Sequence, residues 1–202
     1  MDMVTKTDIQ LDFIGYVDRE LGNYMVAGGW GVDGVLNRIT REHDNVDIMV
    51  PESAVKETKK ALTDYCNEIL TIKEVGEQDD GGVPNMKAVG RDLEANVIVM
   101  HPVCYKDNDY TAFETPYHVP FMPIPNEFLH SVNAEVKKVK FLALNPSAQY
   151  MSKITGSKRD REDAKRLRPF VDKSFRKSMR VFAPSSRFEP DTEKLLEIIR
   201  KR

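Results

Sequence analysis

Two neighbouring features of the sequence contain residue types that could act on a phosphate group. The first is the pair Gly28-Gly29, which follows a short apolar run. A glycine turn that opens a helix can bring bare backbone N–H groups to a phosphate, because no side chain blocks the approach. Glycines also occur in such turns for backbone reasons alone. The pair by itself therefore leaves both interpretations open.

The second feature is the triplet Asn45-Val46-Asp47 in the next apolar run. Side chains alternate along a strand, so Asn45 and Asp47 should share one face. Two carboxylates placed in this way can hold divalent cations that bridge the phosphates of a nucleoside triphosphate, and a third carboxylate nearby can accept a proton. Asn45 offers only a neutral carbonyl oxygen. Asp44 is an alternative ligand if a bulge turns it to the same side, and Glu94 is a weaker one.

The elements that would position these residues follow from the apolar pattern. Apolar side chains that recur every four residues predict a first helix over residues 7–21. Strands are predicted at 24–27 and 46–50, because short apolar runs end there at turn residues. Helices are predicted at 30–36 and from Pro51 onward, since proline is tolerated in the first turn.

The rest of the chain continues this alternation. Further strands are predicted at residues 69–72, 86–89, 95–100 and 139–144, and helices at 150–154, at 164–171 and from Pro190. The pair His101-Pro102 should end the third of these runs, because proline donates no ladder hydrogen bond. Residues 102–133 are rich in proline and aromatic residues, which predicts irregular or edge-strand structure.

This order of elements predicts an α+β fold, with a small mixed sheet that carries helices on one face and a C-terminal helical subdomain. We place the boundary near residue 145, which gives a first domain over 1–145 and a helical region over 146–202.

Composition limits the classes of function. The chain has 202 residues, 41% of them hydrophobic, and a net charge of -2. No run reaches the roughly 18 apolar residues of a membrane span, and two cysteines are too few for a disulfide framework, so we expect a cytoplasmic protein that binds no membrane.

Residues 158–202 contain 15 Lys and Arg against 8 Asp and Glu. This basic segment could meet a polyphosphate, a nucleic acid or the acidic body. Its modest surplus argues against a nucleic acid partner.

The segment GGWGVDGVLNRITREHDNVDIMV resembles the signature region of the aminoglycoside and lincosamide nucleotidyltransferases, a branch of the polymerase-beta-like nucleotidyltransferase superfamily. The similarity covers about residues 9–102, and SKRDREDAKRLRPF is a looser match to a basic helix start in such proteins. The residues in step with the family pattern are Gly28, Gly29, Trp30, Asp33, Thr40, Arg41, His43 and Asp47.

The resemblance implies a nucleotidyltransferase-like fold, ATP or another nucleoside triphosphate as substrate, Mg²⁺ as cofactor and a small-molecule hydroxyl as acceptor. Asp47 would bind metal, with Asp44 as a substitute ligand, and Asp47 and Asn45 would stand at the catalytic positions. The nucleotide-binding residues that it implies are Gly28, Gly29, Trp30, Arg41, Lys153, Lys158 and Arg159.

Several of these residues have a plainer interpretation beside the implied one. Trp30 and Asp33 are expected to pack and to make a helix-to-loop hydrogen bond, and His43 is expected to be a structural histidine. Arg41 can reach a phosphate with two N–H groups, or it can form a surface ion pair with Glu42 or Asp44.

The sequence also departs from the family pattern. Asn45 stands where the family has its first metal ligand, and Val99 stands where it has a third carboxylate. One protein anion should hold Mg²⁺ poorly beside a triphosphate, so two main functions are weighed. One is transfer of a nucleoside monophosphate to a small molecule. The other is a non-catalytic nucleotide-binding or protein-interaction module, a pseudoenzyme. An RNA- or protein-modifying transferase is a third alternative, and the sequence leaves the oligomeric state open.

Overall fold

The computed structural model describes residues 5–54, 56–58, 60–61, 64–65, 75–78, 85–89, 94–106, 110–113, 123–154 and 157–175. Within them the chain has the α+β architecture that the sequence predicts. The helices are α1 (Lys6–Glu20), α2 (Gly28–Leu36), α4 (Pro146–Ile154) and α5 (Lys158–Leu167), with 3-10 turns at Glu52–Ala54, Asn126–Phe128 and Arg168–Phe170. The strands are β1 (Met25–Ala27), β2 (Val46–Val50), β3 (Val75–Gln78), β4 (Asn85–Val89), β5 (Glu94–Lys106), β6 (Tyr110–Phe113), β7 (Pro123–Pro125), β8 (Ser131–Val136) and β9 (Val139–Leu144).

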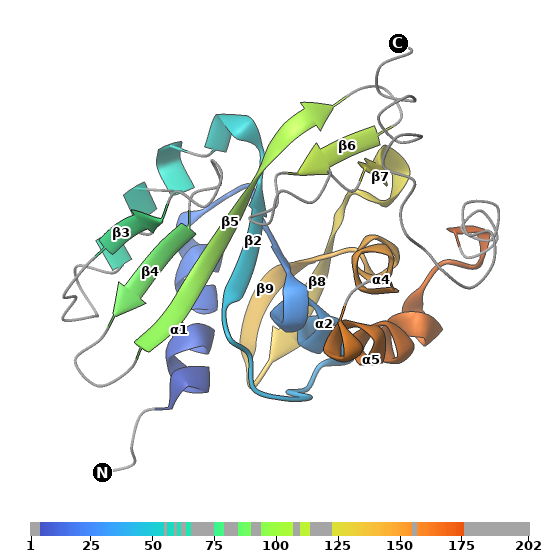
Figure 1. Cartoon of the computed structure of the whole chain (residues 1–202), viewed down its shortest axis with the longest axis horizontal. Helices are drawn as coiled ribbons and strands as arrows, with labels where there is room; N and C mark the ends of the chain where they lie inside the picture. The colour runs from blue at the N-terminus through green and yellow to red at the C-terminus, as the bar shows by residue number, and fades with distance from the viewer. Residues whose placement is uncertain are drawn as a thin grey trace.

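The described strands form a mixed sheet in the order β3-β4-β5-β2-β1-β9-β8 (Figure 1). The pairs β2 with β5 and β1 with β9 are parallel, and the other neighbours are antiparallel. Strands β6 and β7 continue from the second half of β5. In the register of β1 and β2, Ala27 lies opposite Asp47, so the start of α2 is beside the start of β2.

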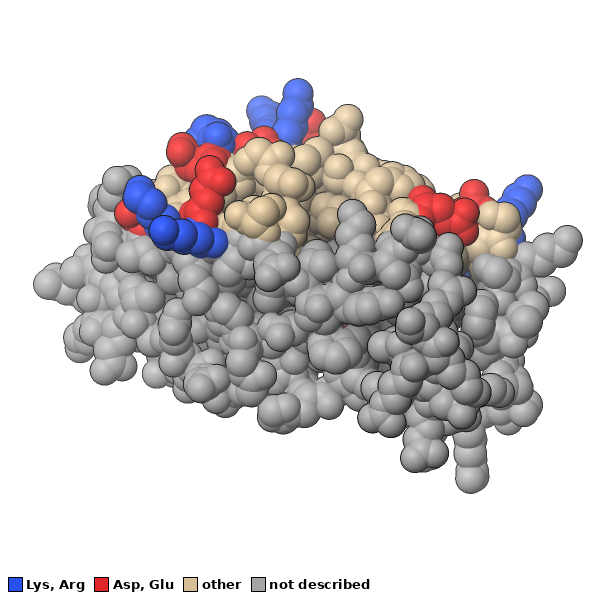
Figure 2. Space-filling view, turned by 90° about the horizontal axis from the view of Figure 1, so that it is seen from above, with Lys and Arg blue, Asp and Glu red and all other residues tan. Residues whose placement is uncertain are grey.

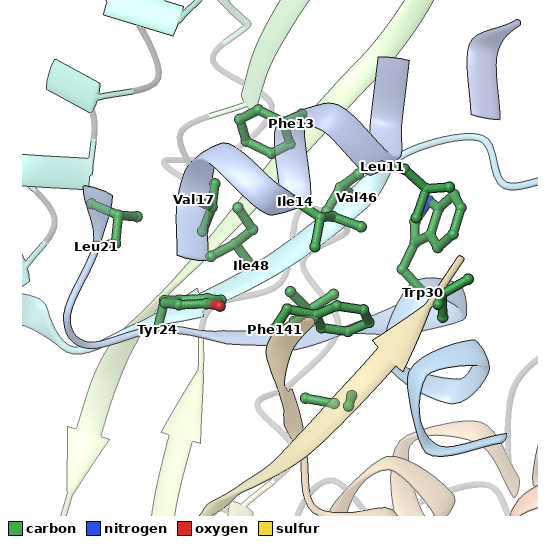
Figure 3. Close-up of a cluster of buried hydrophobic side chains, with 14 of the residues drawn as sticks. Leu11, Phe13, Ile14, Val17, Leu21, Tyr24, Trp30, Val46, Ile48 and Phe141 are labelled. Atoms are coloured by element: carbon green, nitrogen blue, oxygen red, sulfur yellow. The ribbon is translucent and has the colours of Figure 1, made fainter. Parts of the chain in front are cut away.

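Helix α1 covers one face of this sheet. A capping box begins the helix, because the Thr5 hydroxyl accepts from the backbone N–H of Asp8 while the Asp8 carboxylate accepts from the N–H of Thr5. The apolar side chains of α1 then face the strands, where Val46, Ile48 and Phe141 complete the same core (Figure 3). The helix predicted over residues 7–21 is thus confirmed, and its burial holds α1 on the strands that carry the site.

Strand β5 does not end at His101-Pro102, so the prediction of a strand end there is wrong. The strand runs on to Lys106. Its pairing with β4 finishes at Val99 and its pairing with β6 starts at Val103, while Pro102 is the last residue in register with β2. Proline is accommodated because it lies where the strand changes partners, and a missing N–H donor breaks no continuous ladder there.

The proline-rich stretch contains more regular structure than the sequence predicts. The strands β6 and β7 agree with the predicted edge-strand character, but β8 at Ser131–Val136 falls partly inside the stretch predicted as irregular. Strand β8 pairs with β9 through a hairpin whose turn residues, Lys137 and Lys138, both have positive φ angles of 47° and 69°. Such turns usually contain Asn or Gly, so two lysines carry no turn signal.

The C-terminal helices pack on α2. Figure 1 shows α2, α4 and α5 grouped beside β8 and β9. The helix α5 begins with its own capping box, in which Ser157 and Asp160 exchange hydrogen bonds. The helix predicted at 150–154 is confirmed as part of α4, whereas the one predicted at 164–171 begins earlier, at Lys158, and ends at Leu167 before the 3-10 turn; the boundary near residue 145 stays a prediction. The strand predicted at 69–72 and the helix predicted from Pro190 lie outside the described residues.

Two surface features bear on partners. Among the described residues, none of the helices is long and apolar enough to cross a membrane. On the face shown in Figure 2, described Lys and Arg side chains lie beside Asp and Glu side chains and form no extended area of one sign. This part of the surface therefore offers no broad basic track.

Candidate functional site

The glycine pair brings three functional side chains to the start of α2. Gly28 has a positive φ of 61°, which only glycine adopts without strain. A side chain on Gly28 would overlap the Oδ2 atom of Asp47. One on Gly29 would overlap the His43 ring and would lie 2.8 Å from Nη2 of Arg41. Both glycines are therefore needed for close approach, whether or not a phosphate also binds there.

Asn45 and Asp47 are joined by a hydrogen bond. The Nδ2 atom of Asn45 donates to Oδ1 of Asp47 at 2.9 Å. A carboxylate only accepts, so the amide must present its NH₂ group and its carbonyl faces away from Asp47. The two residues predicted for the catalytic positions are thus neighbours, and Asn45 acts on Asp47 as a donor.

The register of the sheet places Val99 beside Asp47. Strands β2 and β5 are parallel, and Asp47 is in register with Val99. The position that the resemblance assigns to a third carboxylate is therefore adjacent to Asp47 in space and is aliphatic. Glu94 lies five residues earlier in β5, about 16 Å along an extended strand, and cannot replace it.

Asp33, Thr40 and His43, which match the family pattern, form a hydrogen-bonded cluster in which Asp33 and His43 are buried. Asp33 accepts from the backbone N–H of Thr40 at 3.1 Å, from its hydroxyl at 2.6 Å and from Nε2 of His43 at 2.6 Å. This arrangement confirms the helix-to-loop hydrogen bond expected for Asp33 and the structural role expected for His43. It ties α2 to the segment that leads into β2.

Trp30 supports that cluster from the core. Its side chain is fully buried, its ring centroid lies 4.6 Å from that of His43, and its Nε1 donates to Gln10 at 3.1 Å. The Gln10 amide in turn donates to the His43 carbonyl at 3.3 Å. Trp30 therefore packs, as its plainer interpretation expects, and the buried indole is not placed to contact a nucleotide. The sequence carried no signal for Gln10.

Arg41 is fixed by the loop and by α5. Its Nη1 donates to the Glu42 carbonyl at 3.0 Å and lies 2.9 Å from Nδ1 of His43, and its Nη2 donates to Asp163 at 3.0 Å. A guanidinium only donates, so Nδ1 of His43 is the acceptor and the ring proton is on Nε2, toward Asp33. The ion-pair partner is Asp163, which is 1% exposed, and not Glu42 or Asp44 as the sequence suggested.

Asp163 and Arg166 are site residues that the sequence did not predict. Asp163 also accepts from Nη1 of Arg166 at 2.9 Å, so one buried carboxylate orients two arginines. Its place in the basic segment of α5 was visible, but nothing in the sequence indicated that it would meet Arg41, 122 residues away.

Arg41 and Arg166 line an open surface pocket of about 640 Å³ between the loop and α5. The lining residues are Arg41, Glu42, Lys158, Arg159, Glu162 and Arg166. Four of the lining side chains are cationic and two are acidic, while Asp163 and Asp44 pair with three of the cations from outside the lining. Because Arg41 also lies beside Gly29, the pocket adjoins the glycine turn.

The other residues predicted to bind nucleotide or metal either line this pocket or form ion pairs. Lys158 and Arg159 line the pocket. Arg159 also donates to Asp44 at 2.7 Å, and Asp44 is 76% exposed and turned toward α5. Lys153 donates to Asp160 at 2.7 Å. Burial alone would raise the pKa of Asp160, but hydrogen bonds from Lys153 and Ser157 hold it below its ordinary value. Thus Asp44 and Lys153 are both engaged away from Asp47.

The donor set at Asp47 does not fit a divalent cation. Of the positions expected to ligate, one is an amide that donates to Asp47 and one is valine. Within the described part of the chain, no group of three His, Cys, Asp or Glu side chains is suited to a metal ion. Mg²⁺ prefers several oxygen ligands in near-octahedral geometry, which these residues do not supply.

Comparison with known proteins agrees with this architecture. The lincosamide antibiotic adenylyltransferase LnuA, in its lincomycin-bound crystal structure, is 21% identical with a TM-score of 0.54, over 84% of this chain and 100% of its own. The solution structure of the antibiotic-resistance factor ANT(2'')-Ia is 15% identical with a TM-score of 0.58, over 99% of this chain and 100% of its own. The crystal structure of ANT(2'')-Ia in complex with adenylyl-2''-tobramycin is 14% identical with a TM-score of 0.52, over 87% and 98% of the two chains.

At these identities the solved structures establish a shared nucleotidyltransferase-like fold. The search among curated proteins finds no match. The profile described as aminoglycoside-2''-adenylyltransferase matches residues 14–167, a span that includes the glycine turn, Asp47 and all six residues that line the pocket. By that match, the chain belongs to the aminoglycoside-2''-adenylyltransferase family.

Proposed function

We propose that this chain binds a nucleoside triphosphate in the pocket beside Gly29 and transfers its nucleoside monophosphate to a hydroxyl group of a small molecule. The observation that carries the proposal is the pocket itself. Four cationic side chains gather next to a glycine turn and within the fold of a nucleotidyltransferase family. Arginine and lysine at such a place suit phosphate oxygens, because charge-assisted hydrogen bonds to phosphate are short and strong.

The proposed reaction assigns distinct tasks to the residues. The acceptor oxygen forms a bond to the α-phosphorus, the bond from that phosphorus to the bridging oxygen breaks, and pyrophosphate leaves with the electron pair. The hydroxyl proton passes to Asp47, the carboxylate at the start of β2. Arg41, Lys158 and Arg159 hold the phosphates and offset the charge that develops on pyrophosphate.

The hydrogen bond between Asn45 and Asp47 favours a second candidate function. It occupies one oxygen of the only acid at the expected catalytic positions. A chain with this arrangement can retain nucleotide binding through the pocket and lose transfer. In that case the protein is a nucleotide-binding module, and its partner would be another protein or an effector.

Binding and transfer can be tested separately with the purified full chain. Titration calorimetry with ATP, GTP, CTP and UTP tests the pocket, and we expect at least one nucleotide to bind. Incubation of that nucleotide with lincomycin or tobramycin, acceptors that occur with the structural neighbours, followed by mass spectrometry, tests transfer. Adduct formation supports the enzyme. Binding without adduct over a panel of hydroxylated antibiotics supports the module, and no nucleotide binding would reject both.

A further inference from the structure

The contacts of the Asp47 carboxylate do not suit a metal ion that would hold the triphosphate. Oδ1 of Asp47 accepts from Asn45, and Oδ2 lies against the α carbon of Gly28. The amide must turn its NH₂ group to the carboxylate, so its carbonyl and the Asp47 oxygens do not converge on one point. A cation shared by the two side chains would require this hydrogen bond to break.

Neighbouring residues do not restore the missing ligands. Val99 is in register with Asp47 and carries no donor atom for a metal. Asp44, the alternative acid, is bound to Arg159 on the α5 side. His43 is buried and has both ring nitrogens engaged, one with Asp33 and one with Arg41.

Fixed positive charge is instead present in the pocket. Arg41 is held rigidly by Glu42, His43 and Asp163, which use three of its five N–H groups. Its Nε is buried and has no hydrogen-bond partner among the described residues, so the donor it can offer to a ligand is the remaining N–H of Nη2 beside Gly29. Arg166 is oriented by the same Asp163. Two arginines are thus preorganised by one buried carboxylate, which lowers the cost of ordering them around a ligand.

We propose that this chain binds the phosphates of its nucleotide without a divalent cation, with the side chains of the pocket supplying the charge that metal ions would otherwise supply. The inference rests on the proposed nucleotide binding. The Asn45–Asp47 hydrogen bond stays intact in the bound form, and Arg41, Lys158, Arg159 and Arg166 neutralise the phosphates.

The test is calorimetric titration of the full chain with the preferred nucleotide in two buffers, one with EDTA and one with Mg²⁺. We expect dissociation constants that agree within about threefold, since no metal contact is gained. Tightening by about tenfold or more in Mg²⁺, or binding that requires Mg²⁺, overturns this inference and leaves the proposed function standing. Absence of binding in both buffers overturns the proposed function and this inference with it.

Titration with Mn²⁺ alone, followed by electron paramagnetic resonance, gives a readout independent of the nucleotide. The unaltered chain should leave the Mn²⁺ signal free, whereas Asn45→Asp combined with Val99→Asp should bind Mn²⁺. Tight Mn²⁺ binding to the unaltered chain that Asp47→Asn abolishes would overturn the inference.

A pair of variants on α5 tests the source of the charge. Lys158 lines the pocket, whereas Lys165 is exposed on the same helix and does not line it. In the EDTA buffer, Lys158→Ala should weaken nucleotide binding by about tenfold, the value of one charge-assisted hydrogen bond, and Lys165→Ala should leave it unchanged. Equal effects of the two substitutions would place the phosphates elsewhere.

Discussion

The Asp47 carboxylate lies directly against the α carbon of Gly28, so that a single added methyl group would overlap its Oδ2 atom. The contact joins the end of β1 to the start of β2 and fixes the orientation of the Asp47 carboxylate. The backbone conformation and the contact with Asp47 both require glycine at position 28, because Gly28 also has a positive φ of 61°.

Substitution Gly28→Ala should therefore destabilise the protein. We expect a loss of about 2 kcal/mol or more in the free energy of unfolding, from left-handed backbone strain and from displacement of Asp47. Urea denaturation measures the change. Gly22→Ala is the matched control, because a side chain at Gly22 meets nothing within 4 Å. Equal stability of the two variants would contradict the contact between Gly28 and Asp47.

The cluster around Asp33 should matter more for stability than its chemistry alone suggests. Asp33→Ala removes the partner of Thr40 and His43 inside the protein, and we expect a loss of about 3 kcal/mol, since unpaired buried polar groups are costly. Asp64→Ala, which breaks an exposed pair with Lys60, should leave the free energy of unfolding nearly unchanged. Thermal and urea unfolding of both variants compares them. A small effect at Asp33 would mean that the cluster does not hold the loop.

The ion pair between Asp44 and Arg159 competes with phosphate for the arginine. Both side chains are largely exposed, so the pair should add little to stability. Asp44→Asn should release Arg159 and tighten nucleotide binding by about two- to fivefold. Titration calorimetry measures the change, and Glu20→Gln removes the same charge from the end of α1 as a control. Weaker binding in Asp44→Asn would show that Asp44 itself serves the ligand.

The capping box of α5 should make stability depend on pH. The pKa of Asp160 is below its ordinary value of 3.8, because hydrogen bonds from Lys153 and Ser157 outweigh the effect of burial. Folding then favours the ionised form. The stability that the ionised Asp160 carboxylate contributes is fully present above about pH 4 and is lost as the pH falls through the folded-state pKa of Asp160.

Asp160→Asn should accordingly cost on the order of 1 kcal/mol near neutral pH, and the difference from the unaltered chain should shrink below about pH 4. Urea unfolding at a series of pH values between about 3 and 7 tests this. A difference that stays constant on acidification would assign the loss to packing of the helix rather than to the carboxylate charge.

The hairpin between β8 and β9 can be stabilised through its turn. Lys137 and Lys138 both have positive φ angles, which are costly for lysine and natural for Asn-Gly. Replacing the pair by Asn-Gly should raise the free energy of unfolding by about 1 kcal/mol. Replacing both by alanine removes the same charges without favouring the turn and should bring no gain. Equal effects would assign the change to charge.

The sequence by itself determined most of the local structure. The recurrence of apolar residues was sufficient for α1, because burial of one face imposes a period, and short apolar runs that end at turn residues were sufficient for β1 and β2. The sequence also showed that two of the expected carboxylates are absent, since Asn45 and Val99 stand at those positions. It did not reveal β8, because the turn that pairs it consists of two lysines without a turn signal.

Only the tertiary structure decided how the site is assembled. Val99 became a neighbour of Asp47 through the register of two strands far apart in the chain. Arg41 met Asp163 because α5 packs against the loop after α2. Such contacts depend on which elements pack together and in which register. The apolar pattern of the sequence shows which face of an element is buried, but not which other element packs against that face.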